Sequence, residues 1–281
     1  MRWTFLKMQA LGNDFVVVDA RGSDRRLAGE QARALADRHF GVGCDQVLEL
    51  STPGLAGAAA RYRVFNADGS SAEHCGNGVR CVARYLARTQ SATVGAANGH
   101  MTIELENGQA AEVELLAGEL VRVSMGEPDF APASIPLDVA DQADYYEAAL
   151  PAATVRFAAV STGNPHAVIE VADTGAAAVG DIGPALQALP LFPRQANVGF
   201  VEVVNDQHLR LRVYERGAGE TLACGTGACA AAVVMIRDGR ARSPVTVQLP
   251  GGELEIAWDG PGSEIFMTGP GQFVFEGEIE L

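Results

Sequence analysis

Runs of β-branched and aromatic residues that alternate with polar residues dominate this chain. After an apolar opening segment that we interpret as a first strand, they occupy residues 15–20, 62–67, 100–116, 120–125, 156–171, 199–205, 208–216, 244–258 and 264–270. Gly, Asn, Asp or Pro separates the runs, as the connections between antiparallel strands require. The pattern predicts many short strands in a mostly antiparallel sheet.

Helical periodicity is confined to fewer stretches. These are residues 29–40, the segment from Cys75 to about Arg88, residues 181–189, and the segment from Cys224 to about Arg237. Strands and helices do not alternate as in a βαβ repeat, so the predicted fold class is α+β.

The proline-containing segment 126–137 lies near the middle of the chain and predicts a linker. The halves on either side share an order: strands, a Cys-Gly loop, a central helix and further strands. We interpret this order as an internal duplication.

Composition excludes several classes of protein. Of 281 residues, 48% are hydrophobic and 20% charged, which is typical of a globular protein. Lys7 interrupts the apolar N-terminus, and no apolar run reaches the roughly 18 residues of a membrane span, so we expect a cytoplasmic protein. With a net charge of −14 and no basic cluster beyond short pairs, nucleic acid and anionic membranes are not the expected partners.

Cysteine and lysine usage narrows the chemistry further. The five cysteines are an odd number in a chain without an export signal, which argues against a disulfide framework. The only lysine, Lys7, lies in the opening strand, and a pyridoxal phosphate enzyme needs a lysine for its Schiff base. Neither a dinucleotide-binding glycine motif nor a Walker A sequence is present. The sequence therefore predicts no cofactor.

Two similar segments carry the candidate chemistry, EHCGNGVRCVARYL at 73–86 and LACGTGACAAAV at 222–233. In each, a cysteine precedes a glycine and stands where a helix is expected to begin. Glycine lets a ligand approach the backbone, and the first turn of a helix offers N–H donors and a positive dipole end that favour a carboxylate. The same environment lowers the pKa of a thiol. Each segment is therefore a candidate anion site with an activated thiol.

Two such loops facing each other suit the inversion of a carbon next to a carboxylate. One thiolate would remove the proton from one face of the carbon, and a thiol would return a proton to the other. The alternatives are buried core cysteines, which suits Cys81, Cys229 and Cys44, a zinc site and a redox disulfide. Zinc is disfavoured because the two cysteines of each helix lie on different faces, and a redox role lacks a C-x-x-C pair. We therefore expect no metal.

Sequence blocks along most of the chain resemble the diaminopimelate epimerase family, in that family's order. The blocks are MQALGNDFVVVD (8–19), GVGCDQVL (41–48), FNADGSSAEHCGNGVRC (65–81), GNPHAV (163–168), ANVGFV (196–201) and VYERGAGETLACGTGACAA (213–231). The resemblance implies a cofactor-independent isomerase that interconverts LL- and meso-2,6-diaminopimelate in lysine and peptidoglycan precursor biosynthesis.

The resemblance also implies an architecture. The expected fold has two pseudo-symmetric domains, each a curved, mostly antiparallel β-sheet wrapped around a central helix, with the active site in the cleft between them. The expected bounds are 1–125 plus 269–281 for one lobe and 126–268 for the other. Members of the family are usually homodimers, and Phe275 stands where the family has an aromatic dimer contact.

The resemblance assigns roles to individual residues. It makes Cys75 and Cys224 the two acid/base thiols, and His166 and Glu215 the residues that tune proton transfer. The backbone amides expected to hold the reacting carboxylate belong to Gly76, Asn77, Gly225 and Thr226. Residues expected to contact the substrate are Asn13 and Gln46 near the reacting end, and Asn66, Asn164, Asn197, Glu215 and Arg216 largely at the distal end.

Two other functions stay open on the sequence alone. A racemase of the proline or hydroxyproline type uses a similar cysteine pair with different distal residues, and a non-catalytic amino-acid-binding protein would not need two thiols. The chain also departs from the family pattern at Ser71, His74 and Cys44. A protonated His74 beside Cys75 would shift the pKa of that thiol.

Overall fold

A computed structural model describes residues 2–72, 75–89, 99–151 and 153–281. The chain divides into two compact units. The first unit comprises Met1–Ser124 and Thr268–Leu281, and the second comprises Met125–Met267. These bounds lie one residue from the ones expected from the sequence. The chain passes back into the first unit within β16 (Phe266–Pro270).

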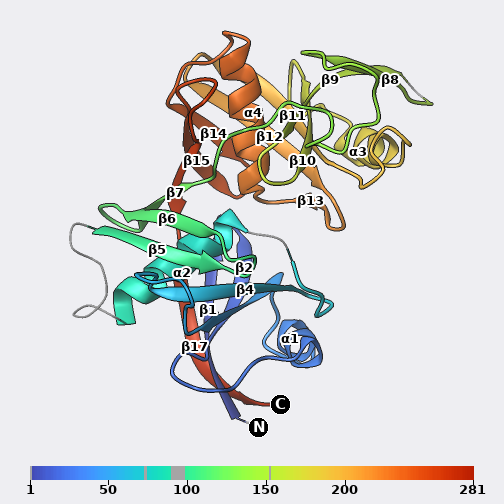
Figure 1. Cartoon of the computed structure of the whole chain (residues 1–281). Helices are drawn as coiled ribbons and strands as arrows, with labels where there is room; N and C mark the ends of the chain where they lie inside the picture. The colour runs from blue at the N-terminus through green and yellow to red at the C-terminus, as the bar shows by residue number, and fades with distance from the viewer. Residues whose placement is uncertain (1, 73–74, 90–98, 152) are drawn as a thin grey trace. The chain divides into compact units, whose positions relative to one another are not determined.

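The first unit is a sheet whose final strand comes from the end of the chain (Figure 1). Its strands follow the order β17-β1-β2-β3-β4-β5-β6-β7, with parallel pairs at β2/β3 and β4/β5 and antiparallel pairs elsewhere. The elements are β1 (Arg2–Ala10), β2 (Asn13–Asp19), α1 (Gly29–Ala36), β3 (Gln46–Ser51), β4 (Ala60–Asn66), α2 (Gly76–Thr89), β5 (His100–Leu105), β6 (Ala110–Leu115), β7 (Leu120–Ser124) and β17 (Gln272–Glu280).

The second unit repeats this arrangement. Its strands follow the order β8-β9-β10-β11-β12-β14-β15, with parallel pairs at β10/β11 and β12/β14, and β13 pairs with the end of β12. The elements are β8 (Tyr146–Ala149), β9 (Thr154–Ser161), β10 (Pro165–Glu170), α3 (Val179–Gln187), β11 (Asn197–Asn205), β12 (His208–Glu215), β13 (Gly219–Thr221), α4 (Gly225–Arg237), β14 (Val245–Leu249) and β15 (Gly252–Ala257). The parallel pairs fall at corresponding places, which confirms the internal duplication.

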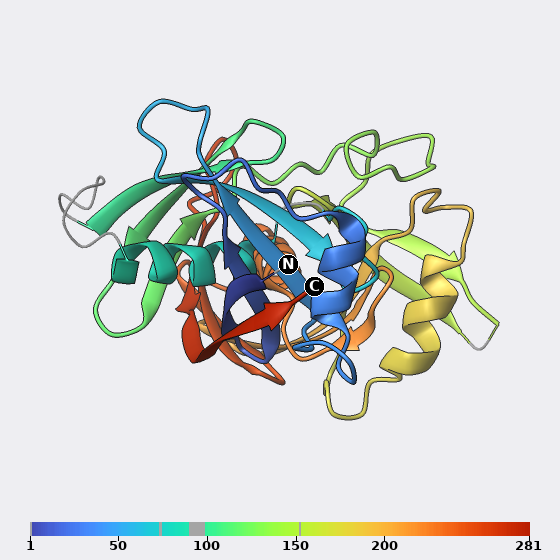
Figure 2. The same cartoon turned by 90° about the horizontal axis from the view of Figure 1, so that it is seen from below.

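Each sheet wraps around one buried helix. Helix α2 contacts β1, β2, β5, β6, β7 and β17, and α4 contacts β9, β10, β11, β12, β14 and β15. Helix α1 packs on β3 and β4 (Figure 2). Side chains alternate between the faces of a strand, so Val16 and Val18, which pack with Leu35 of α1, lie opposite Phe15 and Val17 on the face toward α2. Because both faces are covered, β2 is a continuous apolar run.

The predicted elements are present, with local differences. Helix α1 ends at Ala36 rather than residue 40, because the Asp37 carboxylate accepts the N–H groups of His39 and Phe40 and turns the chain. Strand β3 escaped prediction because Glu49 interrupts its apolar pattern. Glu49 is buried and forms an ion pair with Arg63 at 2.7 Å. Within the described ranges, none of the helices combines the length and apolarity needed to cross a bilayer.

Candidate active site

Three predicted polar residues meet at one end of the first sheet. Asn13 begins β2, Gln46 begins β3 and Asn66 ends β4. Since β2 and β3 run parallel and β4 runs antiparallel to β3, these positions lie at the same end of the three strands. Strand alternation directs all three toward the α2 face. Gln46 Nε2 donates a hydrogen bond to Asn66 Oδ1 at 3.3 Å.

Cys75 stands at the start of α2. Its carbonyl accepts the first helical hydrogen bond, from the N–H of Val79 at 3.0 Å. Asn13 Oδ1 lies 4.0 Å from Cys75 Sγ and accepts a hydrogen bond from Asn77 Nδ2 at 3.2 Å. The structure thus joins Asn13, Cys75 and Asn77 in one cluster, with the Gly76 amide between the last two.

The second unit holds a matching cluster at the corresponding end of its sheet. Asn164 precedes β10, His166 lies in it, Asn197 begins β11 and Glu215 ends β12. Asn164 Oδ1 lies 2.8 Å from His166 Nε2, and Asn197 Nδ2 lies 3.5 Å from the same nitrogen. Asn197 Oδ1 also accepts the backbone N–H of Arg216 at 2.9 Å. These predicted residues are therefore neighbours.

Cys224 is the N-cap residue of α4, with an extended backbone at φ −114° and ψ 104°. Its carbonyl accepts the N–H of Ala228 at 2.9 Å, as the Cys75 carbonyl does in α2. Its Sγ lies 3.6 Å from the Thr226 hydroxyl. A Cβ on Gly227 would lie 3.2 Å from this sulfur and 3.0 Å from Val213 Cγ2, so the sulfur's position favours glycine there.

The environment of Cys224 keeps it protonated. Cys224 is 3% exposed, and burial raises the pKa of its thiol well above 9. The negative charge of Glu215 and a hydrogen bond to it raise this pKa further, against the opposing hydrogen bond with Thr226. The Thr221 hydroxyl donates a hydrogen bond to Glu215 Oε1 and so fixes the carboxylate.

His166 is the neutral group of this cluster. It is 1% exposed, and burial lowers its pKa from 6.5 to about 3, with a further contribution from the charge of Arg216. The short contact with an amide oxygen indicates that Nε2 carries the proton of the neutral ring and donates it to Asn164. The imidazole is thus a fixed dipole near neutral pH.

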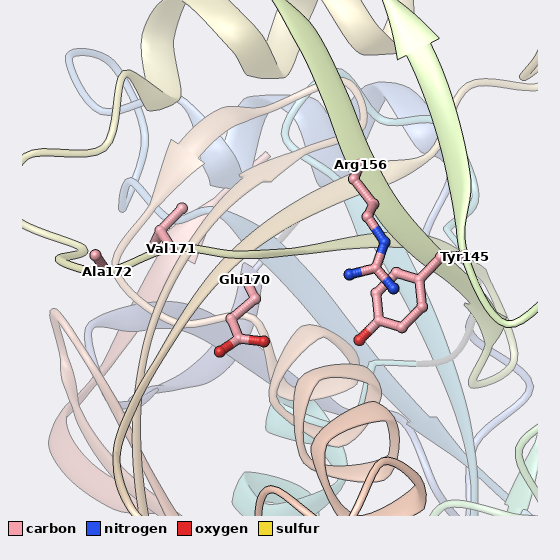
Figure 3. Close-up of a pocket in the computed structure, with 5 residues that line it drawn as sticks. All are labelled: Tyr145, Arg156, Glu170, Val171 and Ala172. Atoms are coloured by element: carbon pink, nitrogen blue, oxygen red, sulfur yellow. The ribbon is translucent and has the colours of Figure 1, made fainter.

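Two described cavities lie apart from these clusters. One, of about 370 Å³ in the second unit, is lined by Tyr145, Arg156, Glu170, Val171 and Ala172 (Figure 3). In it the Arg156 guanidinium stacks 3.6 Å above the Tyr145 ring, and Glu170 pairs with Arg240 at 2.6 Å. A cavity of about 590 Å³ in the first unit lies between α2, β1, β2 and β17. Neither is lined by a predicted site residue.

The remaining cysteines are core residues, as predicted. Cys44, Cys81 and Cys229 are buried, and burial raises the pKa of Cys44 and Cys81 to about 12. Across the described part of the chain, no group of three His, Cys, Asp or Glu side chains could hold a metal ion. His74 lies outside the described residues.

Sequence reasoning missed three supporting residues. Tyr62 donates a hydrogen bond to the Cys75 carbonyl, Thr221 to Glu215, and Thr162 Oγ1 to the Thr226 carbonyl at 3.2 Å. The alternation of YRVFN already places Tyr62 on the same face as Asn66, which was the available signal. Phe275, the expected dimer contact, is 50% exposed on β17.

The duplicated fold defines a structural class with solved members. A phenazine biosynthesis protein of the PhzF family from Bacillus anthracis superposes with a TM-score of 0.70 over 100% of both chains at 17% identity. A probable proline racemase from Agrobacterium radiobacter superposes with a TM-score of 0.71 over 99% of this chain and 93% of that chain, also at 17% identity. These likenesses show the fold.

Sequence comparison gives the family. The sequence model of diaminopimelate epimerase matches residues 5–131 and 158–274. A relative from Xanthomonas euvesicatoria, named diaminopimelate epimerase, is 51% identical over 99% of this chain and 96% of its own length. One of the same name from Alkalilimnicola ehrlichii is 51% identical over 100% of both chains. The chain belongs to the diaminopimelate epimerase family.

Proposed function

We propose that this protein interconverts LL- and meso-2,6-diaminopimelate by proton transfer between two thiols, without a cofactor. The observation that carries the proposal is the duplicated half-site: Cys75 and Cys224 each begin the central helix of one unit, beside a glycine. The sequence relatives named diaminopimelate epimerase support the substrate. An amino-acid-binding protein would need one carboxylate site and no thiol at either helix.

The thiols act on opposite faces of the same α-carbon. Cys224 is buried and protonated, so it is the acid for the step in which Cys75 takes the α-proton as a thiolate. The reverse reaction exchanges these roles. The first amides of α2 and α4, at Gly76 and Asn77 and at Gly225 and Thr226, bind the reacting carboxylate, whose oxygens gain charge as the C–H bond breaks.

Glu215 is assigned first to Cys224, because it already contacts that thiol and accepts the Thr221 hydroxyl. A carboxylate has several acceptor positions, so Glu215 is also assigned to a substrate ammonium group. His166 tunes the same region as a neutral dipole. Arg216 offers a fork of donors to the distal carboxylate. The substrate-binding assignments of Asn13, Gln46, Asn66, Asn164 and Asn197 follow their places in the two clusters.

We also propose a homodimer with Phe275 in its interface. Phe275 and Val274 are exposed on β17, and Phe275 is anchored edge-on against Phe5, with ring centroids 6.0 Å apart. A rigid exposed aromatic is the kind of residue that oligomer contacts favour. The cytoplasmic location stays a prediction from the sequence.

Turnover in D2O tests the reaction and the substrate together. With LL-diaminopimelate, deuterium should appear at one α-carbon as meso product forms, and L-proline should show neither exchange nor racemisation. Deuterium uptake from proline instead would assign the protein to the proline racemase type. A protein that binds diaminopimelate without exchange is a binding protein.

Substitution of each thiol tests its role against a matched control. Cys75→Ala and Cys224→Ala should abolish epimerisation, whereas Cys81→Ala and Cys229→Ala, one to two turns further along the same helices, should retain it. Wild-type turnover in Cys75→Ala or Cys224→Ala would remove that thiol from the reaction. Arg216→Ala should raise KM strongly, and an unchanged KM would mean that the distal carboxylate binds elsewhere.

A further inference from the structure

A buried phenol supports the backbone at the start of α2. Tyr62, on β4, is 2% exposed, and its hydroxyl donates a hydrogen bond to the Cys75 carbonyl at 3.1 Å. The same carbonyl accepts the N–H of Val79 at 3.0 Å. This carbonyl oxygen therefore has both of its acceptor positions occupied, one by the helix and one by the sheet.

A carbonyl held twice fixes the amide on the other side of the same peptide bond. The peptide unit is planar, so the Cys75 carbonyl and the Gly76 N–H lie in one plane and point in opposite directions. The two hydrogen bonds that hold the carbonyl consequently aim the Gly76 N–H. Donation to the carbonyl also polarises the peptide and strengthens that N–H as a donor.

Gly78 shows how closely the phenol approaches the helix. A Cβ at this position would lie 2.5 Å from the Tyr62 oxygen and 3.3 Å from Leu48 Cδ2, so a side chain there would displace the hydroxyl. Burial raises the pKa of Tyr62 well above 10, which keeps the phenol a hydrogen-bond donor at neutral pH. The glycine two residues after Gly76 thus makes room for the donor.

The second unit lacks this support. In the β3/β4 register Leu50 pairs with Tyr62, and at the corresponding place in β11/β12 Val201 pairs with Leu211. The residue equivalent to Tyr62 is therefore Leu211, which has no hydroxyl. The hydrogen bond is a specific feature of the Cys75 half-site and not a requirement of the duplicated fold.

We propose that Tyr62 is a positioning residue for the reaction: through the Cys75 carbonyl, it aims the Gly76 N–H at the reacting carboxylate of the substrate. This inference rests on the proposed function. The carboxylate gains negative charge when the α-proton leaves, so a misaimed donor costs more in the transition state than in the bound substrate. Loss of the hydroxyl should therefore lower kcat more than it raises KM.

The test compares Tyr62→Phe with Tyr85→Phe. Tyr85 lies in the same helix, and its hydroxyl donates to Asp19 Oδ2 at 2.8 Å, so the control removes one hydroxyl and one hydrogen bond elsewhere. Tyr62→Phe should lower kcat roughly 10-fold with KM changed less than about 3-fold, a smaller loss than the 10²–10³ for removing a transition-state donor itself. Tyr85→Phe should keep the kcat of the wild type.

Gly78→Ala gives a second route that does not remove the tyrosine. The added methyl should push the hydroxyl aside and lower kcat in the wild-type background. In the Tyr62→Phe background the oxygen is absent, so Gly78→Ala should lower kcat much less, and the two effects should be strongly non-additive. Additive losses would mean that Gly78 and Tyr62 act separately.

One readout is independent of turnover. Loss of a hydrogen bond to the Cys75 carbonyl should shift the ¹⁵N resonance of the Gly76 amide in Tyr62→Phe and leave it in place in Tyr85→Phe. An unshifted Gly76 resonance, or full kcat in Tyr62→Phe, overturns the inference. A wild-type protein that fails to epimerise diaminopimelate overturns the proposed function instead, while the amide shift still reports whether Tyr62 holds this peptide.

Discussion

Acidification is expected to destabilise the second unit through His166. The ring is 1% exposed, and burial lowers its pKa from 6.5 to about 3, with the charge of Arg216 acting in the same direction. The folded protein therefore keeps this histidine neutral at pH values where the unfolded chain protonates it. Stability from this group is fully present above pH 6.5 and falls as the pH drops from 6.5 toward 3.

The magnitude follows from the two pKa values. Between them, each pH unit below 6.5 costs about 1.36 kcal/mol, so at pH 5.0 the loss is about 2 kcal/mol. Carboxylates with lowered pKa values do not obscure this window. The pKa of Asp14, for example, is lowered to about 2 because hydrogen bonds from Arg38 and Lys7 outweigh the opposing effect of burial. With an unperturbed value of 3.8, Asp14 is ionised above pH 5 in both states.

The measurement is urea unfolding at pH 7.5 and pH 5.0. The tryptophans are Trp3 in the first unit and Trp258 in the second, so a Trp3→Phe background leaves a fluorescence probe of the second unit alone. In that background, the free energy of unfolding should fall between pH 7.5 and pH 5.0 in both proteins. The fall should be about 2 kcal/mol smaller in His166→Gln than in the parent. His39→Gln, which changes an exposed histidine, should follow the parent.

The decisive quantity is how strongly the free energy of unfolding depends on pH in the parent compared with His166→Gln. Parallel losses of unfolding free energy in the parent and in His166→Gln would show that the folded state accommodates the imidazolium. The reasoning that burial keeps this ring neutral would then be wrong. A reduced slope in His39→Gln as well would point to histidine titration in general and not to the buried site.

Three further predictions concern other groups. Glu215→Gln should lower the pKa of Cys224 and raise its iodoacetamide alkylation rate at pH 7.5 roughly 10-fold, measured by peptide mass spectrometry; an unchanged rate contradicts the assigned contact. Phe275→Arg should convert the proposed dimer to monomer in sedimentation, and a dimer that persists in this variant would place the interface elsewhere. Lys7→Met should cost roughly 2 kcal/mol in urea unfolding, because Lys7 is buried against Asp14 at 2.5 Å; no loss would show that Arg38 suffices for that carboxylate.

Local patterns predicted most elements of the fold because their causes are local. A glycine directly after Cys75 and Cys224, followed by an apolar helical repeat, marks the starts of α2 and α4. The strand β3 was not predicted because the buried Glu49 depends on an ion pair with Arg63, a partner on the neighbouring strand. A one-dimensional pattern does not contain that pairing.

The sequence names candidate site residues but does not reveal their arrangement in space. Asn13, Gln46 and Asn66 lie far apart in the sequence, and the parallel pairing of β2 with β3 brings them to one end of the sheet. Such pairing is set by tertiary contacts, so spacing alone does not reveal it. Tyr62 was overlooked for a related reason, since a buried aromatic in a strand pattern is typical of core, and only the structure shows what its hydroxyl contacts.

The two units keep one backbone plan and vary the side chains on it. In the parallel pairs, Phe15 occupies the place in the first unit that His166 occupies in the second. Asn66 pairs with Gln46, and continuing the β11/β12 register one residue past the Val198–Tyr214 pair makes Glu215 its equivalent. A carboxylate therefore lies beside Cys224 where the first unit has an amide. Two-base epimerisation needs one protonated and one deprotonated thiol at the start of each turnover. Duplication supplies two thiols at helix starts, and in the second unit burial and the neighbouring carboxylate raise the pKa of Cys224.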